Sequence, residues 1–249
     1  MIDTANVATW LETTLIFRGL SPEQRQSLTQ IAQLQHFKKG EQIFRQDQEA
    51  TGFYVVRTGR VKVFQMSANG KEQILNIFTE GDNFADVPAL DGQVFPASAA
   101  ALEPADLIFF PRYPFLDFLH HSPEVAVKML ISLSSHLRHL AQLVEQLSFK
   151  SVPQRLATYL LNLGNTVGDT VSDTLRDTAA RSRSTAPDTV YLDLTKSQLA
   201  ARLGTIPATL SRAFYQLSHD DIIAIAGPKV TILDRDRLVA LSQSPDASD

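Results

Sequence analysis

Residues 195–233 read TKSQLAARLGTIPATLSRAFYQLSHDDIIAIAGPKVTIL, and this stretch decides the fold of the C-terminal part of the chain. It contains two short helical patterns, each with one apolar face, on either side of a glycine turn at Gly204. Two helices joined in this way form a helix-turn-helix unit. The apolar runs 222–225 and 230–233, which flank Gly227-Pro228, predict a β-hairpin. The stretch therefore predicts a winged helix-turn-helix.

The second helix of this unit has a polar face opposite to its apolar face. Arg212 lies on the polar face, and arginine is the best bidentate reader of guanine O6 and N7. Hydroxyl and ammonium groups near the start of each helix suit contacts to DNA phosphates. A polar face that meets only solvent is the alternative that these residues leave open. The predicted DNA contacts are Lys196, Ser197, Thr205, Thr209, Ser211 and Arg212.

The overall charge of the chain is acidic, with 23 lysines and arginines against 27 aspartates and glutamates among 249 residues. This balance argues against a protein that coats nucleic acid without specificity. Between residues 195 and 217, however, Lys196, Arg202 and Arg212 face no acidic residue. A local basic patch of this kind favours a specific, salt-sensitive DNA-binding protein with double-stranded DNA as its partner.

Several chemistries are excluded by what the sequence lacks. The chain has no cysteine, which excludes disulfides, zinc–thiolate sites and cysteine-ligated iron–sulfur clusters. It carries no G-x-S-x-G, G-x-x-x-x-G-K or H-E-x-x-H motif, so we expect a protein that is not an enzyme. Neither an export signal nor a run of about 18 apolar residues is present, so we expect a cytoplasmic protein without a membrane partner.

The segment that begins at Ser122-Pro123-Glu124 predicts a long helix with an apolar stripe. From Ala126 onwards, apolar residues recur at alternating spacings of four and three, as in a heptad repeat, for about three heptads. Packing on a sheet of the same chain is one way to cover such a stripe. The regular spacing of leucines favours a seam between two copies, so we predict a homodimer through Leu130, Leu133, Leu137, Leu140, Val144 and Leu147.

Residues 38–111 consist of short apolar or alternating runs separated by glycines. Asn69-Gly70 is the sharpest turn signal, because both residues tolerate the positive φ of a tight hairpin. We predict an α+β protein with an N-terminal β-roll of the jelly-roll kind. Its expected domains are a β-roll sensor domain with flanking helices (1–121), a dimerisation helix (122–150) and a DNA-binding domain (151–249). Within the last, a helix that ends near Gly164 precedes a flexible insert, 165–188, poor in large apolar residues.

The whole arrangement resembles the CRP/FNR superfamily of bacterial transcription regulators. The segments that carry the resemblance are Gly40-Glu41, YVVRTGRVKVF (54–64), NGKEQIL (69–75), EGDNFADVPAL (80–90), LSFKSVPQRLA (147–157) and LGTIPATLSR (203–212). The resemblance implies a cyclic-nucleotide-binding-like β-roll, a long dimerisation helix and a winged helix-turn-helix on a two-fold symmetric operator. It also implies that an effector alters how the two reading helices are presented, and that an activator would contact RNA polymerase.

The chain departs from the cyclic-AMP-binding members of that family. Where they carry a Gly-Glu pair and then an Arg-Ser or Arg-Thr pair, this chain has Ala85-Asp86 and Phe95-Pro96. Without the arginine there is no bidentate partner for a cyclic phosphate, and proline has no N–H to donate. Leu140 and Ala141 stand where those members contact adenine. We therefore expect no response to cyclic AMP.

These departures leave a predominantly apolar effector pocket. A pocket packed shut like any core is one alternative, and a small apolar ligand, or DNA binding without an effector, is another. FADVPALDGQVFPASAAAL (84–102) is similar to the branch that senses nitric oxide with haem, which makes haem a candidate with His136 as its metal ligand. His139 is expected to point outward. The predicted pocket residues are Phe84, Asp86, Phe95, Pro96, His136, Leu140 and Leu143.

The reading helix also departs from the family. Members that read TTGA-like or TGTGA-like half-sites usually have Glu where this chain has Ala208, while Ser211-Arg212 matches the FNR-like pattern. We expect Arg212 to read a guanine and the neighbouring base pair to lose the discrimination that a glutamate supplies. The sequence thus predicts an effector-responsive, homodimeric DNA-binding regulator. A structural module that does not bind DNA is the competing class.

Overall fold

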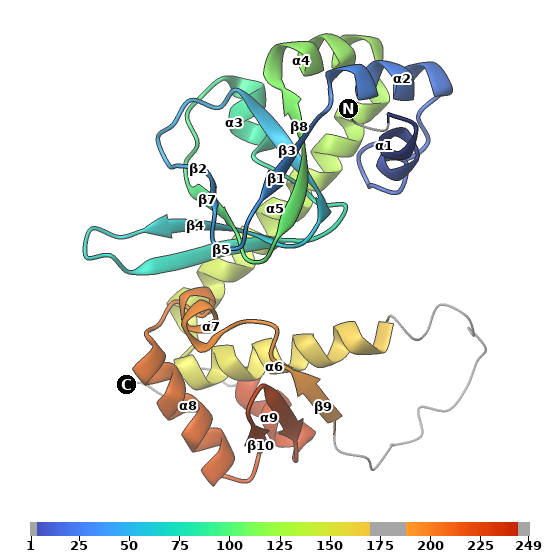
Figure 1. Ribbon diagram of the computed structural model, residues 1–249. Coiled ribbons are helices and arrows are strands. Elements are labelled where there is room, and N and C mark those ends of the chain that lie inside the picture. Colours follow the sequence, from blue (N-terminus) through green and yellow to red (C-terminus); the bar gives the residue numbers. More distant parts are fainter. Residues whose placement is uncertain (1–3, 170–187, 244–249) are drawn as a thin grey trace, which may run out of the picture. The chain divides into compact units, whose positions relative to one another are not determined.

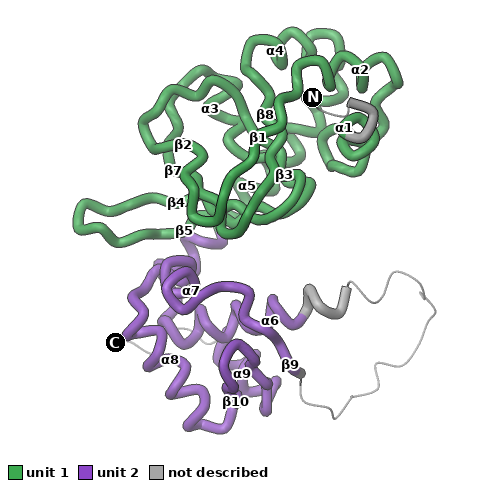
Figure 2. Tube along the Cα trace, in the orientation of Figure 1, with its two compact units in different colours: residues 1–141 green, residues 142–249 purple. Residues whose placement is uncertain are grey.

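The computed structural model describes residues 4–169 and 188–243. They fall into two compact units, divided between Ala141 and Gln142 (Figure 2). Most of the predicted flexible insert, residues 170–187, lies outside the described residues. Its first part was predicted wrongly, because helix α6 runs from Val152 to Asp169 and so continues past Gly164. Its last residue, Asp188, begins strand β9.

The first unit contains the predicted β-roll, which is built from two antiparallel four-stranded sheets (Figure 1). The strand orders are β1-β8-β3-β6 and β2-β7-β4-β5. Apolar side chains from both sheets, among them Phe44, Val56 and Leu107, meet in a core between them. The strands are β1 Gln33–Phe37, β2 Gln42–Phe44, β3 Gly52–Thr58, β4 Val61–Met66, β5 Glu72–Phe78, β6 Asn83–Phe84, β7 Ser98–Ala101 and β8 Ala105–Pro111.

The hairpin expected at Asn69-Gly70 joins β4 to β5. Gly70 has φ +78° and its N–H donates to the carbonyl of Ser67, while Asn69 is not among the residues with positive φ. Residues 67–70 thus form a four-residue turn closed by a hydrogen bond between its first and last residues. Such a turn needs one left-handed residue, whereas a two-residue hairpin loop needs two. The Ser67 hydroxyl closes the loop by accepting from the Lys71 N–H at 3.0 Å.

A second core lies between the sheet that contains β3 and β8 and the helices around it. Phe53 and Phe110 from the strands pack against Phe17 and Phe115, with ring centroids 4.5–6.3 Å apart. Such edge and offset contacts are the favourable geometries of aromatic pairs. The helices of this unit are α1 Thr4–Leu11, α2 Pro22–Ile31, α3 Asp86–Asp91 and α4 Arg112–His121, followed by the start of α5 Pro123–Phe149.

Helix α5 has two apolar stripes, of which the sequence analysis identified one. The second stripe, with the same alternating spacing, begins at Val125 and continues through Met129 and Ser132, which are buried against the β-roll. The predicted seam faces away from the β-roll, and Leu137 and Val144 on it are 69% and 64% exposed in the single chain. The stripe that begins at Val125 is therefore covered by the chain itself, and the predicted seam is not.

The second unit contains the predicted winged helix-turn-helix. Helices α7 and α8 are joined through Gly204, which has φ +65°, and the hairpin β10–β11 pairs with β9 in a three-stranded antiparallel sheet. Leu199, Leu210 and Phe214 are buried in its core. The elements that follow α6 are β9 Asp188–Tyr191, α7 Lys196–Arg202, α8 Pro207–His219, β10 Ile223–Ala226, β11 Lys229–Ile232 and α9 Arg235–Gln243. Across the described residues, none of the helices has the length and apolarity needed to cross a membrane.

Candidate effector pocket and nucleic-acid interface

The first unit holds a pocket of about 190 Å³ between the β-roll and α5. At this pocket, the segments around Phe84 and Phe95 lie beside the long helix α5. Of the predicted pocket residues, all but Leu143 line it. Leu143, three residues beyond Leu140 on α5, is not among the residues that line it. The lining residues are Phe44, Val63, Leu75, Asn76, Phe78, Phe84, Ala85, Asp86, Val87, Pro88, Phe95, Pro96, Ala97, His136, His139 and Leu140.

Aromatic rings form much of the pocket wall. Phe44 and Phe95 stack with centroids 3.8 Å apart and planes at 15°. Phe78 and Phe84 stack beside them at 5.3 Å. Phe44, Phe84 and Phe95 are buried, so this wall is packed against the core of the β-roll and has fixed neighbours. The wall is a preformed apolar surface on which a flat molecule can lie.

Asp86 is a buried carboxylate at the edge of this wall. It is 3% exposed, and its Oδ2 accepts from Asn83 Nδ2 at 2.8 Å. Asn83 in turn accepts from the Ser132 hydroxyl on α5 at 2.9 Å. Burial raises the pKa of Asp86, while the facing His136 and the hydrogen bonds to the ionised carboxylate oppose that rise. The chain Ser132–Asn83–Asp86 therefore ties α5 to the start of α3 by polar contacts.

Two histidines of α5 face the pocket. His136 packs edge-on against Phe78 with ring centroids 5.4 Å apart. His139 also lines the pocket, and its Nε2 lies 3.1 Å from the carbonyl oxygen of Leu75. The expectation that His139 points outward was wrong, because the inner stripe continues from Ser132 at the same alternating spacing and includes both histidines.

The outer edge of the pocket is shared with the predicted dimer seam. Leu140 lines the pocket and is also 42% exposed, on the same stripe as Leu137. Val87 and Pro96 line the pocket as well and are exposed, so the opening lies beside them. A molecule bound in the pocket would thus touch a residue of the predicted interface.

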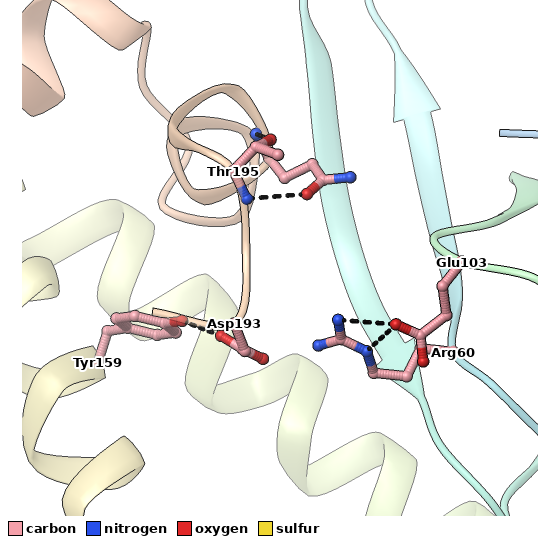
Figure 3. Close-up of polar contacts among 6 residues, drawn as sticks. Arg60, Glu103, Tyr159, Asp193 and Thr195 are labelled. Carbon is pink, nitrogen blue, oxygen red and sulfur yellow. Dashed lines mark hydrogen bonds and ion pairs between the residues drawn. The ribbon is translucent and has the colours of Figure 1, made fainter. Parts of the chain in front are cut away.

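Local hydrogen bonds fix the start of α7 in the second unit. The Thr195 hydroxyl accepts from the Gln198 N–H at 3.3 Å, and Gln198 Oε1 accepts from the Thr195 N–H at 2.9 Å (Figure 3). This capping box satisfies two backbone donors at the helix end. The hydroxyl of Tyr159 on α6 donates to Asp193 just before it (Figure 3). Lys196 and Ser197 in the first turn are both exposed.

Helix α8 presents the predicted polar face to solvent. Leu210, Phe214 and Leu217 are buried, while Ser211 and Arg212 are exposed. Thr205 and Thr209 are half-buried, and the Ser211 hydroxyl donates to the Pro207 carbonyl at 2.9 Å. The face that carries Arg212 is therefore free to enter a groove while the opposite face holds the helix in the core.

Sequence reasoning missed further exposed side chains on this face. Tyr215 is 71% exposed one turn after Ser211, and its ring lies near His219, with centroids 5.9 Å apart. Gln216, four residues after Arg212, is exposed as well. Helical spacing of three and four residues from Arg212 was the signal that could have found them. In the first unit, the buried Asn83 was missed as well, because it stands in the polar run 79–83 and resembles a turn residue.

Comparison with known proteins agrees with both halves of this description. Residues 34–122 match the cyclic nucleotide-binding domain family, and residues 154–241 match the Crp-like helix-turn-helix domain family. The chain belongs to the CRP/FNR family. As a CRP/FNR regulator it is a DNA-binding transcriptional regulator and not an enzyme, in agreement with the expectation from its motifs.

Individual relatives cover most of this CRP/FNR chain. It is 28% identical over 205 residues to the transcriptional activator protein Anr of Pseudomonas protegens, which is 82% of this chain and 78% of Anr. It is 26% identical to the CRP-like cAMP-activated global transcriptional regulator of Mycobacterium tuberculosis, over 90% of this chain and 94% of the relative. FixK2 from Bradyrhizobium japonicum has a similar fold, with a TM-score of 0.67 and 23% identity over 86% of this chain and 98% of FixK2.

Proposed function

We infer that this CRP/FNR regulator works as a homodimer that binds a two-fold symmetric operator and responds to an effector other than cyclic AMP. The observation that carries the DNA half is α8, with its apolar face buried and Arg212 exposed on the opposite face. A reading helix of this kind enters the major groove through its N-terminal residues. Lys196, Ser197, Thr205, Thr209 and Ser211 are the further contacts we assign to the DNA.

The dimer is supported by the outward stripe of α5. Leu130, Leu137 and Val144 are each more than 60% exposed in the single chain, at the heptad spacing of a two-stranded coiled coil. Two copies joined along α5 would present two α8 helices, and two-fold symmetric half-sites about 34–36 Å apart are expected. Leu130, Leu133, Leu137, Leu140, Val144 and Leu147 form the proposed interface.

The test of the DNA half is selection of binding sites from random duplexes, followed by titration of the preferred duplex. Arg212→Ala is expected to weaken binding by about 10- to 100-fold and to relax the preference for one guanine. Lys196→Ala is expected to weaken all sequences alike and to reduce the salt dependence by about one phosphate contact. Arg138→Ala, which removes an exposed arginine of α5, is the control for lost charge. Equal loss in Arg138→Ala and Arg212→Ala would contradict the assignment.

The pocket is the proposed effector site. Phe95 and Pro96 lie in its wall, and among the described residues that line it there is no lysine or arginine to hold a phosphate. Burying that anion beside Asp86 without a cation is unfavourable, so cyclic AMP is expected to leave DNA affinity unchanged. We propose that the effector acts through Leu140, which belongs both to the pocket and to the α5 stripe. An effector shifts the DNA-binding population only through its different affinity for the two states.

Haem is a second candidate effector, favoured by His136 in the pocket wall. Imidazole is a common axial ligand of haem iron, and bound haem would bring the capacity to bind a diatomic gas. The described residues hold no cluster of three or more histidine, aspartate or glutamate side chains suited to a metal ion. One histidine fits a haem, but a porphyrin is several times larger than the single benzene ring that a pocket of about 150 Å³ accepts. Titration with hemin, followed by Soret absorption in the wild type and in His136→Ala, tests this candidate.

A further inference from the structure

Among the described residues that line the pocket, His136 is a polar group for which the structure shows no hydrogen-bond partner. Asp86 is already satisfied, because its oxygens accept from Asn83 Nδ2 and from the Val87 N–H. His136 contacts the Phe78 ring and faces Asp86, but within the described part of the chain neither of its ring nitrogens makes a hydrogen bond. A ligand that fills the apolar space without reaching His136 would leave this polar group desolvated and unpaired.

The volume of the pocket limits the size of its ligand. A dry protein cavity of about 150 Å³ holds one benzene molecule, and this pocket has about 190 Å³. That difference accommodates a single ring with one or two small substituents. The stacked rings of Phe44 and Phe95 and the ring of Phe78 offer the offset and edge contacts that an aromatic ring prefers.

The charges around the pocket limit the charge of its ligand. Asp86 contributes a carboxyl group, and no lysine or arginine is found among the described lining residues. A carboxylate or phosphate on the ligand would therefore meet a like charge, and among the described lining residues only the imidazoles of His136 and His139 could oppose it. A neutral hydroxyl can both donate to an imidazole nitrogen and accept from one, so it matches either form of His136.

We propose that the pocket binds a neutral single-ring aromatic molecule with one hydroxyl group, the ring lying against Phe44, Phe78 and Phe95 and the hydroxyl hydrogen-bonded to His136. This inference rests on the proposed function, since it specifies the class of effector. It also gives that effector a route to DNA binding: the ligand fills space beside Leu140, where the pocket meets the exposed stripe of α5.

The test uses four compounds that share one ring and one methyl group: p-cresol, toluene, p-toluate and 4-methylbenzylamine. Binding to the full-length protein is measured by calorimetry and by the shift in melting temperature, neither of which depends on DNA. We expect p-cresol to bind one per subunit and about tenfold more tightly than toluene, because only p-cresol satisfies His136. We expect p-toluate and 4-methylbenzylamine to bind more weakly than p-cresol.

Two variants separate the hydrogen bond from the cavity. His136→Phe keeps a ring beside Phe78 and removes both nitrogens, so p-cresol and toluene should then bind within about twofold of each other. Leu75→Trp places a larger ring in the pocket and should abolish binding of both. His121→Phe, at an exposed histidine of α4, is the control and should behave as the wild type.

Three results would overturn the proposal. They are no binding by any of the four compounds, binding of p-toluate or 4-methylbenzylamine as tight as that of p-cresol, and a preference for p-cresol that survives in His136→Phe. Saturable hemin binding at one per subunit that is lost in His136→Phe, together with no p-cresol binding, would assign the pocket to haem instead. Failure of the DNA-binding function would appear separately, as an absence of operator selection by a protein that still binds p-cresol.

Discussion

The two stripes of α5 have the same spacing and opposite environments. The inner stripe runs through Val125, Met129, Ser132 and His136, of which the first three are buried against the β-roll. The outer stripe runs through residues such as Leu137, which is 69% exposed. The inner stripe mixes apolar with polar residues, whereas the outer one is almost entirely leucine and valine.

The difference shows that the more apolar stripe is not the one that the chain covers for itself. An intrachain contact can use serine and histidine where the β-roll and α3 supply hydrogen-bond partners or a pocket. Association of two identical helices requires side chains that pack against their own copies, for which branched apolar residues at heptad spacing are suited. This asymmetry supports the proposal that one face of α5 packs on the β-roll and the other on a second copy.

The largest expected effect comes from a charge on the outer stripe. Leu137→Asp should weaken self-association at least about 1000-fold, because two carboxylates would be buried opposite each other in the dimer. Ile131→Asp, at an apolar residue of α5 that is 54% exposed but lies off the stripe, should leave the dimer intact. Sedimentation equilibrium measures both. If Ile131→Asp dissociates the dimer as strongly as Leu137→Asp does, the seam has been assigned to the wrong face.

The next largest effect compares two adjacent residues of α5, one on the inner stripe and one on the outer stripe. Met129 is 2% exposed and Leu130 is 62% exposed. In the monomeric Leu137→Asp background, Met129→Ala should lower the free energy of unfolding by about 3 kcal/mol, because it leaves a cavity beneath the β-roll. Leu130→Ala should change it by no more than about 0.5 kcal/mol. Urea denaturation gives both values, and comparable losses would show that the monomer covers both faces.

A smaller effect is expected from the polar member of the inner stripe. Ser132→Ala leaves the buried Asn83 Oδ1 without its donor, so the free energy of unfolding should fall by about 1–2 kcal/mol. Ser134→Ala is the control, because the Ser134 hydroxyl is exposed and donates to the carbonyl of Leu130 in its own helix. The prediction is contradicted if the two serine variants have equal stability in urea.

The smallest effect is the dependence of stability on pH through Asp86. Burial raises its pKa above the ordinary value of 3.8, so the folded chain keeps the proton to a higher pH than the unfolded chain does. The stability linked to the protonated form is present below about pH 4 and is lost as the pH rises through the folded pKa.

Asp86→Asn stays neutral throughout this range. The unfolding free energy of the variant relative to the wild type should therefore increase between pH 4 and 7. Denaturation at a series of pH values tests this. The same series is measured for His136→Phe, because His136 faces Asp86 and favours its ionised form. A relative free energy that falls with rising pH would show that Asp86 is stabilised as the carboxylate.

Much of the fold could be predicted because its signals are local. A glycine turn between two apolar-faced helices, proline in the first turn of α8 and the heptad spacing of α5 each involve neighbours within a few residues. The end of α6 could not be placed in this way. Residues 165–169 contain no proline, and a helix tolerates a single glycine such as Gly168, so no local signal marks where α6 stops.

Some residues of the pocket could be assigned from the sequence, and others only from the structure. Phe84, Phe95 and His136 could be assigned to one site because the family resemblance aligns their segments. His139 and Asn83 could not, because their roles depend on contacts with Leu75 and Ser132, which lie 64 and 49 residues away in the chain. The pairing of β3 with β6, which positions Phe84 opposite Tyr54, is likewise a long-range contact.

The sequence by itself determined the order of the parts, the helix-turn-helix and the heptad stripe of α5, because periodicity and turn chemistry act over a few residues. Only the tertiary structure decided which face of α5 the β-roll covers, and so which histidines enter the pocket and which leucines stay exposed. The physical reason is that burial depends on which segments pack together: identical spacings predict identical stripes, and only packing gives one of them a partner within the chain.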